Sequence, residues 1–168
     1  MARLFVAVWP PVPVVEQLRA WLRPSGSGLL WTTEHQWHIT LRFLGEADVD
    51  AAATAVGGIT HEPVVARMGP GLRVLGRSAV VTPVTGLDPL AAEVGRAMGG
   101  IGRPPEGRGF QGHLTLGRIA TTDRFTLPPA APTAEWPVTD LALVRSTLLA
   151  SGARYDTVRV IALLPRTP

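Results

Sequence analysis

The sequence predicts a mixed α+β fold in a single domain over residues 1–168. Hydrophobic periodicity gives the element order strand, helix, strand, helix, strands, helix, strand, strands. That order lacks the regular strand–helix alternation of a parallel α/β sheet. A length of 168 residues also suffices for one domain with a sizeable core that needs neither disulfides nor a metal.

The first quarter of the chain predicts a strand, a helix and two further strands. A buried strand is expected over Arg3–Val8, followed by a helix over residues 13–23. Prolines at the start of this helix are tolerated because the N–H groups of the first turn lack intrahelical partners. A Ser/Gly loop at 24–28 leads to a short strand at 29–33, and the next strand ends at Gly45.

The middle of the chain predicts two helices around a group of strands. Either Asp48 or Asp50 is expected to cap a helix that runs to about Gly57. Asp88 is expected to cap a second helix, with Pro89 in its first turn, and Gly99-Gly100 ends this helix. The three strands expected between these helices span residues 63–68, 71–76 and 78–84.

The last part of the chain predicts a loop and three more strands. Residues 99–112 form a glycine-rich loop that is not a phosphate-binding P-loop, because no Gly-Lys-Ser/Thr follows it. A strand begins at Gly112, and a proline-rich turn covers 128–132. Strands at 136–149 and 155–163, joined by residues 151–154, complete the chain.

A four-residue phrase of the pattern His-apolar-Thr-Leu occurs twice, at His38–Leu41 and at His113–Leu116. Both copies lie in predicted strands, where residues i and i+2 share a face. Each copy therefore sets an imidazole beside a threonine hydroxyl, with the apolar residues buried on the opposite face. Two copies in a chain of only four histidines predict a paired site.

Composition excludes several classes of protein. The chain has no cysteine, so it holds no disulfide framework and no thiolate metal cluster. Its start lacks the pattern of a signal peptide, and no apolar run reaches the length of about 18 residues of a membrane span. We expect a soluble, cytoplasmic protein, monomeric and without a cofactor or metal.

The net charge of +3 permits an anionic partner without requiring one. All sixteen basic residues are arginine, and they form no basic run. The chain contains neither lysine nor asparagine. This composition is typical of a genome-wide codon bias. Arginine enrichment alone is therefore weak support for nucleic-acid binding.

Two facing imidazoles suit a reaction that needs an acid and a base together. Their unperturbed pKa near 6.5 lets one be neutral and the other charged at physiological pH. Attack of water on a cyclic phosphodiester has this need, since one proton leaves water and another reaches the departing sugar oxygen. Threonine hydroxyls and a nearby arginine would stabilise the phosphate oxygens.

Two arginines are candidates for that phosphate contact. Arg42 shares strand parity with His38 and Thr40, so we expect it to point into the same space. Arg118 has the opposite parity to His113, and it reaches the site only if its strand ends or bulges after Leu116. Geometry alone ranks Arg42 first.

Other aromatic and basic residues have two open interpretations. Phe110 and Tyr155 are candidates for stacking on a base, with core packing as the alternative. Arg103 and Arg108 are candidates for contacts to an RNA backbone, with solvated loop charges as the equal alternative. Four of the five tryptophans are expected in the core or in the wall of the site, at positions 9, 21, 31 and 37.

The paired His-x-Thr phrases and their flanks resemble the 2H phosphoesterases, and most closely their RNA 2′,3′-cyclic phosphodiesterase branch, also called the 2′-5′ RNA ligase family. The similarity extends over most of the chain. It is carried by residues 3–8, 37–46, 110–118 and 143–155. The doubled phrase is the most specific part of the match.

The resemblance implies a bilobal fold in which two antiparallel sheets line a central cleft, with helices outside. It also implies metal-independent hydrolysis of an RNA 2′,3′-cyclic phosphate to a 2′-phosphate. His38 would be the general acid that protonates the leaving 3′-oxygen, and His113 the general base that activates water. Thr40 and Thr115 would bind the phosphate.

Two features bear on how closely the chain follows this family. The family's arginine after the second phrase corresponds to Arg118. The resemblance therefore makes Arg118 a stronger candidate for the phosphate contact, relative to Arg42, than strand parity does. The family often has proline before the second histidine, and Gly112 is expected to leave the start of that strand looser.

Three functions fit the same residues. The first is hydrolysis of cyclic-phosphate RNA ends. The second is ligation of such an end to a 5′-hydroxyl through a 2′-5′ bond. The third is a nucleotide-binding module without turnover, which the intact histidines and threonines argue against.

Overall fold

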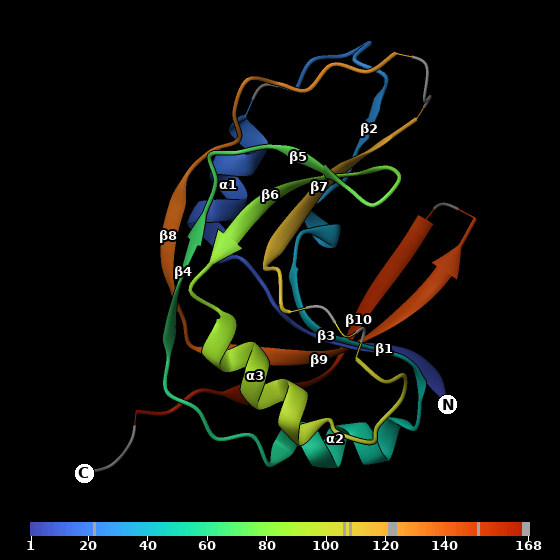
Figure 1. Ribbon diagram of the computed structural model, residues 1–168, viewed down its shortest axis with the longest axis vertical. Coiled ribbons are helices and arrows are strands. Elements are labelled where there is room, and N and C mark those ends of the chain that lie inside the picture. Colours follow the sequence, from blue (N-terminus) through green and yellow to red (C-terminus); the bar gives the residue numbers. More distant parts are fainter. Residues whose placement is uncertain (22, 106, 108, 121–123, 151, 166–168) are drawn as a thin grey trace.

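Two antiparallel sheets and three α-helices make up the computed structural model, which describes residues 1–21, 23–105, 107, 109–120, 124–150 and 152–165 (Figure 1). The first sheet has the order β10-β9-β1-β3 and the second the order β2-β7-β6-β4-β8. A further strand, β5 (Arg73–Leu75), pairs with β6. The predicted α+β class with two antiparallel sheets is confirmed.

The strands follow the predicted segments closely. Those of the first sheet are β1 (Ala2–Val8), β3 (Ile39–Ala47), β9 (Asp140–Leu149) and β10 (Gly152–Ala162). Those of the second sheet are β2 (Leu29–Trp31), β4 (Val64–Met68), β6 (Ala79–Thr85), β7 (His113–Ile119) and β8 (Ala134–Val138).

The helices start near the predicted positions. They are α1 (Val12–Ala20), α2 (Val49–Gly57) and α3 (Asp88–Ala97). Asp48 caps α2, since its carboxylate accepts a hydrogen bond from the Ala51 N–H at 2.8 Å. Asp88 is the first residue of α3 rather than its cap, and Leu87 holds the cap position.

The secondary structure departs from the prediction in several places. Helix α1 ends at Ala20, before the predicted end at residue 23, because Trp21 has an extended backbone. The strand expected over 136–149 is two strands, interrupted at Thr139, whose carbonyl accepts a hydrogen bond from the Leu163 N–H at 2.7 Å. A short 3-10 helix η1 (Glu34–Gln36) precedes β3 and was not expected. Two residues named in the prediction, Arg108 and Ser151, lie outside the described residues.

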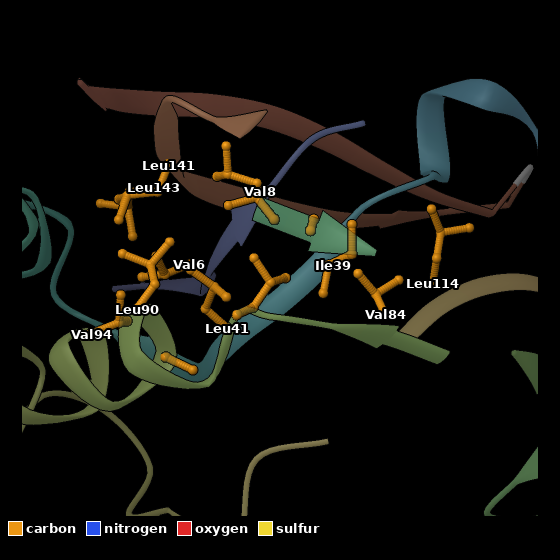
Figure 2. Close-up of a cluster of buried hydrophobic side chains, with 14 of the residues drawn as sticks. Val6, Val8, Ile39, Leu41, Val84, Leu90, Val94, Leu114, Leu141 and Leu143 are labelled. Atoms are coloured by element: carbon orange, nitrogen blue, oxygen red, sulfur yellow. The ribbon is translucent and has the colours of Figure 1, made fainter. Parts of the chain in front are cut away.

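One hydrophobic core draws side chains from both sheets and from the helices. Helices α2 and α3 pack against strands of the first sheet, and both lie in the lower half of Figure 1. Figure 2 shows Ile39 of β3 and Leu114 of β7 in one buried cluster with Val84. Because Ile39 and Leu114 directly follow the two histidines, the apolar sides of both His-Thr phrases face this shared core.

A smaller buried cluster lies on the opposite face of the first sheet. It contains Phe5, Ala7, Ala142 and Val144, with two partly buried aromatic side chains, Trp9 and Tyr155, packed against it. We call this the aromatic face. No helix among the described residues is long and apolar enough to cross a membrane.

Candidate active site

His38 lies between η1 and β3, where the chain enters the edge strand of the first sheet. Its Nδ1–H donates a hydrogen bond to the Gln36 carbonyl at 2.8 Å. A carbonyl oxygen only accepts, so this bond fixes the proton on Nδ1 of the neutral ring. The lone pair of Nε2 is therefore available for proton transfer.

His113 repeats this arrangement at the start of β7. Its Nδ1–H donates to the Gln111 carbonyl at 2.7 Å. The repeated sequence pattern thus also includes a glutamine two positions before each histidine and reads Gln-x-His-apolar-Thr-Leu. In both copies the glutamine carbonyl orients the imidazole. Sequence inspection missed the glutamines, although the shared spacing was visible.

Both strands also carry a bulge directly after the threonine. In the β1–β3 pair, Thr40 lies opposite Ala7 and Arg42 opposite Val6, so Leu41 is the extra residue. In the β6–β7 pair, Thr115 lies opposite Val81 and Gly117 opposite Val80. Each bulge reverses the strand parity of the residues that follow it, in β3 as far as a second bulge at Leu44.

The first bulge corrects the prediction for Arg42. Opposite residues of an antiparallel pair share a face, so Thr40 lies on the aromatic face with Ala7, whereas Arg42 lies on the core side with Val6. Its guanidinium instead donates from Nη2 to the Arg103 carbonyl at 2.8 Å. The expectation that Arg42 shares the space of His38 is therefore wrong.

Arg118 was expected to reach the site only if its strand ends or bulges after Leu116, and the second bulge meets this condition. His113, Thr115 and Arg118 lie opposite Pro83, Val81 and Ala79, which alternate along β6 and so share one face. Arg118 is exposed on that face beside the second phrase. The residue at the same place after the first bulge is Phe43, which lies opposite Phe5 on the aromatic face.

Three aromatic rings surround His38. Its ring centroid lies 4.8 Å from that of Phe5, 5.0 Å from Tyr155 and 5.6 Å from Trp9, the last two edge to face. Tyr155 is thus beside the candidate catalytic histidine, where sequence reasoning left its role open. The i, i+2 spacing of Phe5 and Ala7 in β1 and of Trp9 just after it was the available signal for this arrangement.

Burial among these rings lowers the pKa of His38 below its ordinary value of 6.5. The hydrogen bond to the Gln36 carbonyl opposes this shift, and the charge of His113 adds to it. The two imidazoles are therefore close enough to interact electrostatically. In the free protein His38 is mainly neutral at neutral pH.

Thr32 connects the two phrases through hydrogen bonds. Its hydroxyl donates to the Thr115 carbonyl at 3.0 Å and accepts from the Trp37 indole N–H at 3.1 Å. Its backbone N–H donates to the Leu116 carbonyl at 2.9 Å. Trp37 is buried and directly precedes His38, so one side chain ties the second phrase to the residue before the first histidine.

Gly112 packs tightly, contrary to the expectation of a loose start to its strand. A Cβ placed there would lie 2.1 Å from the Val84 carbonyl oxygen. The Val84 N–H donates to the Gly112 carbonyl at 2.9 Å, so a backbone hydrogen bond holds the two segments close together. Glycine therefore permits the strand contact that places His113.

The remaining candidates lie around this site in different ways. Phe110 is partly buried and packs against the main core, which favours the packing interpretation. Arg103 is exposed, and its backbone bonds β3 through the Leu44 carbonyl at 2.7 Å. Among the described residues, no group of three or more His, Cys, Asp or Glu side chains is arranged to hold a metal ion.

Comparison with known proteins agrees with this fold and these motifs. Residues 8–67 match the family model described as LigT like Phosphoesterase. The structure of Escherichia coli LigT complexed with 3′-AMP is 26% identical with a TM-score of 0.79, covering 98% of this chain and 99% of LigT. The protein TT0787 of Thermus thermophilus is 28% identical with a TM-score of 0.75, covering 96% and 97% of the two chains.

A further phosphoesterase structure is 26% identical with a TM-score of 0.80, covering 98% of this chain and 99% of its own. No curated protein sequence matches the chain. The family match begins at the end of β1 and includes the whole first His-Thr phrase. Residues 8–67 therefore match the LigT-like phosphoesterase model, and nearly the whole chain shares its fold with LigT and related phosphoesterases, so the chain is similar to the LigT-like members of the 2H phosphoesterase superfamily.

Proposed function

We propose that the protein hydrolyses RNA 2′,3′-cyclic phosphate ends to 2′-phosphomonoester ends by acid–base catalysis with His38 and His113. The observation that carries this proposal is the matched placement of the two imidazoles. Each donates its Nδ1–H to a glutamine carbonyl, and each precedes a threonine on its own strand. The charge of His113 contributes to the lowered pKa of His38, which supports a shared site for the two imidazoles.

The reaction divides into two proton transfers around one phosphorus atom. Nε2 of His113 takes a proton from water as the water oxygen bonds to phosphorus. The bond from phosphorus to the 3′-oxygen breaks, and Nε2–H of His38 gives its proton to that oxygen. The product keeps its phosphate on the 2′-oxygen.

The phosphate oxygens gain charge as the transition state forms. The hydroxyls of Thr40 and Thr115 are suited to donate to the non-bridging oxygens. Arg118, which the bulge after Thr115 turns to the face of His113, is suited to offset the added charge.

The proton state of His38 fits an acid that forms on binding. Burial keeps its pKa low in the free protein, so the neutral ring predominates there. A bound phosphodiester brings a negative charge that favours the imidazolium, which raises the pKa again. The similar E. coli LigT has been solved with phosphate, 3′-AMP, ATP and NADP+, which supports a phosphate-bearing ligand in this fold. We expect the protein to meet such RNA ends in the cytoplasm.

The test is turnover of a nucleoside 2′,3′-cyclic phosphate in the presence of EDTA. We expect hydrolysis by the wild-type protein and a loss of at least about 100-fold in kcat for His38→Ala and for His113→Ala. The matched control is His35→Ala, since His35 is exposed and sits on η1 outside the two phrases. Full activity in both variants, or a strict need for metal, would contradict the proposal. Adding an RNA with a 5′-hydroxyl to the same assay tests ligation.

A further inference from the structure

A hollow of about 360 Å³ opens at the end of the first sheet, where β1 begins. Strand β9 extends past this point, because it pairs with β1 only as far as Arg145 opposite Leu4. Strand β10 accompanies β9 further, to Leu149. The hollow lies in the notch that β1 leaves beside the longer strands. Its lining consists of Ala2, Arg3, Glu46, Arg145, Ser146, Thr147 and Leu148.

The hollow is linked to the surroundings of His38 by two series of neighbouring residues. Ser146, which lines the hollow, lies directly opposite Tyr155, and Tyr155 contacts His38. The guanidinium of Arg3 lies 5.0 Å from the centroid of the Phe43 ring. Phe43 lies opposite Phe5, another of the rings beside His38.

The spacing of residues along β1 gives the distance between the region beside His38 and the hollow. Ala7 lies opposite Thr40 and Arg3 opposite Glu46, four residues apart on an extended strand. At about 3.3 Å per residue this separates them by about 13 Å. An RNA chain of several nucleotides can place a second phosphate at such a distance from the cyclic end, whereas a cyclic mononucleotide has no second phosphate.

The chemistry of the lining suits a nucleotide. Arg3 and Arg145 are both exposed, and within the described part of the chain neither has a carboxylate at salt-bridge distance. Glu46 is the one acidic side chain of the lining, so the hollow has a net positive charge. Ser146 and Thr147 add hydroxyl donors, and Leu148, 71% exposed, adds an apolar surface.

We propose that this hollow binds a backbone phosphate of single-stranded RNA on the 5′ side of the cyclic end. Arg3 contacts the phosphate from the aromatic face, and Arg145, which lies opposite Leu4 on the core side of β9, contacts it from across the notch. Phe43 and Tyr155 present rings on which the intervening bases stack. The inference rests on the proposed function, because it takes the cyclic end to lie at His38. It makes the protein selective for an RNA chain over a free cyclic mononucleotide.

The experiment compares kcat/KM for a nucleoside 2′,3′-cyclic phosphate with that for a short RNA ending in the same cyclic nucleotide. We expect the wild-type protein to favour the RNA, with a stronger dependence on salt. Arg3→Gln and Arg145→Gln should lower kcat/KM for the RNA and leave the mononucleotide unchanged. Each should also reduce the slope of log(kcat/KM) against log salt by about 0.7 for the contact removed.

Arg96→Gln is the matched control, since Arg96 is exposed on α3, which packs on the other face of the sheet. Equal kcat/KM for both substrates in the wild type, or equal loss on both substrates in the variants, would overturn the inference. Fluorescence anisotropy with labelled RNA separates it from the proposed function. If the wild type hydrolyses neither substrate but the two variants bind RNA more weakly than Arg96→Gln, hydrolysis fails and the RNA site stands.

Discussion

The hydroxyl of Thr32 donates a hydrogen bond to the carbonyl of Thr115 at 3.0 Å, across 83 residues of sequence. The same oxygen accepts the indole N–H of Trp37, the residue before His38. Two short polar contacts therefore set the spacing between the two His-Thr phrases. Thr32 touches no reacting group, so we regard it as a positioning residue.

Replacing Thr32 by valine should lower both stability and catalysis. Valine keeps the shape but leaves the Thr115 carbonyl and the Trp37 indole N–H without this partner, which costs about 1–3 kcal/mol. We expect kcat to fall more than KM rises, because the two imidazoles lose alignment rather than binding area. Urea denaturation and steady-state kinetics measure the two effects.

Thr32→Ser is the matched variant, since it restores the hydroxyl. Recovery of kcat in Thr32→Ser is expected. A loss of stability in Thr32→Val with kcat unchanged would contradict the positioning role.

Arg118 and Arg42 should respond differently to loss of charge. Arg118→Gln removes the guanidinium on the face of His113, and we expect kcat/KM to fall by about 100-fold. Arg42→Gln removes the bond to the Arg103 carbonyl on the other side of its strand, so it should reduce stability more than kcat/KM. Kinetics together with urea denaturation of both variants test this, and the reverse ranking would contradict the bulge argument.

Gly112→Ala should displace the start of β7. Its Cβ would lie 2.1 Å from the Val84 carbonyl oxygen, so the backbone beside His113 must shift, at a cost of about 1–3 kcal/mol. Activity should fall with stability. Gly95→Ala in α3 is the control, because its Cβ meets nothing within 4 Å and alanine favours a helix by up to about 1 kcal/mol. Equal melting temperatures for the two variants would contradict the tight packing at Gly112.

The lowered pKa of His38 should make the protein less stable in mild acid. Because the folded pKa lies below 6.5, the unfolded chain binds more protons in the window between the two values. The free energy of unfolding therefore falls as the pH drops from about 6.5 towards the folded pKa, and His38 contributes no such loss above that window.

Urea denaturation between pH 5 and pH 8 checks this effect, with His38→Gln as the comparison. We expect the loss below pH 6.5 to be smaller in the variant. Inorganic phosphate should reduce the loss in the wild type, because its charge favours the imidazolium. Identical pH curves for the two proteins would rule out a buried neutral His38.

Sequence patterns predicted most elements of this fold and four residues of the candidate site. Alternation placed Ile39 and Leu114 in the core, and it set Thr40 beside His38, because period two holds within each short phrase. It failed one residue later, for Arg42. A bulge depends on how two strands pair, and single-strand periodicity carries no information about pairing.

Contacts between distant segments were also outside the reach of sequence patterns. The packing of Tyr155 against His38 depends on the sheet order β10-β9-β1-β3, which joins the two ends of the chain. The bond between Thr32 and Thr115 depends in the same way on the pairing of β2 with β7. The local sequence around Tyr155 or Thr32 gives no indication of either contact.

Product analysis on an RNA with a 2′,3′-cyclic phosphate end tests the central claim most directly. Incubated with the wild-type protein in EDTA and followed by ³¹P NMR, the cyclic phosphate should convert to a 2′-phosphomonoester alone. The His38→Ala and His113→Ala proteins, folded by circular dichroism, should leave it intact. A 3′-phosphate product, or an unchanged cyclic end with the wild-type protein, would contradict the account.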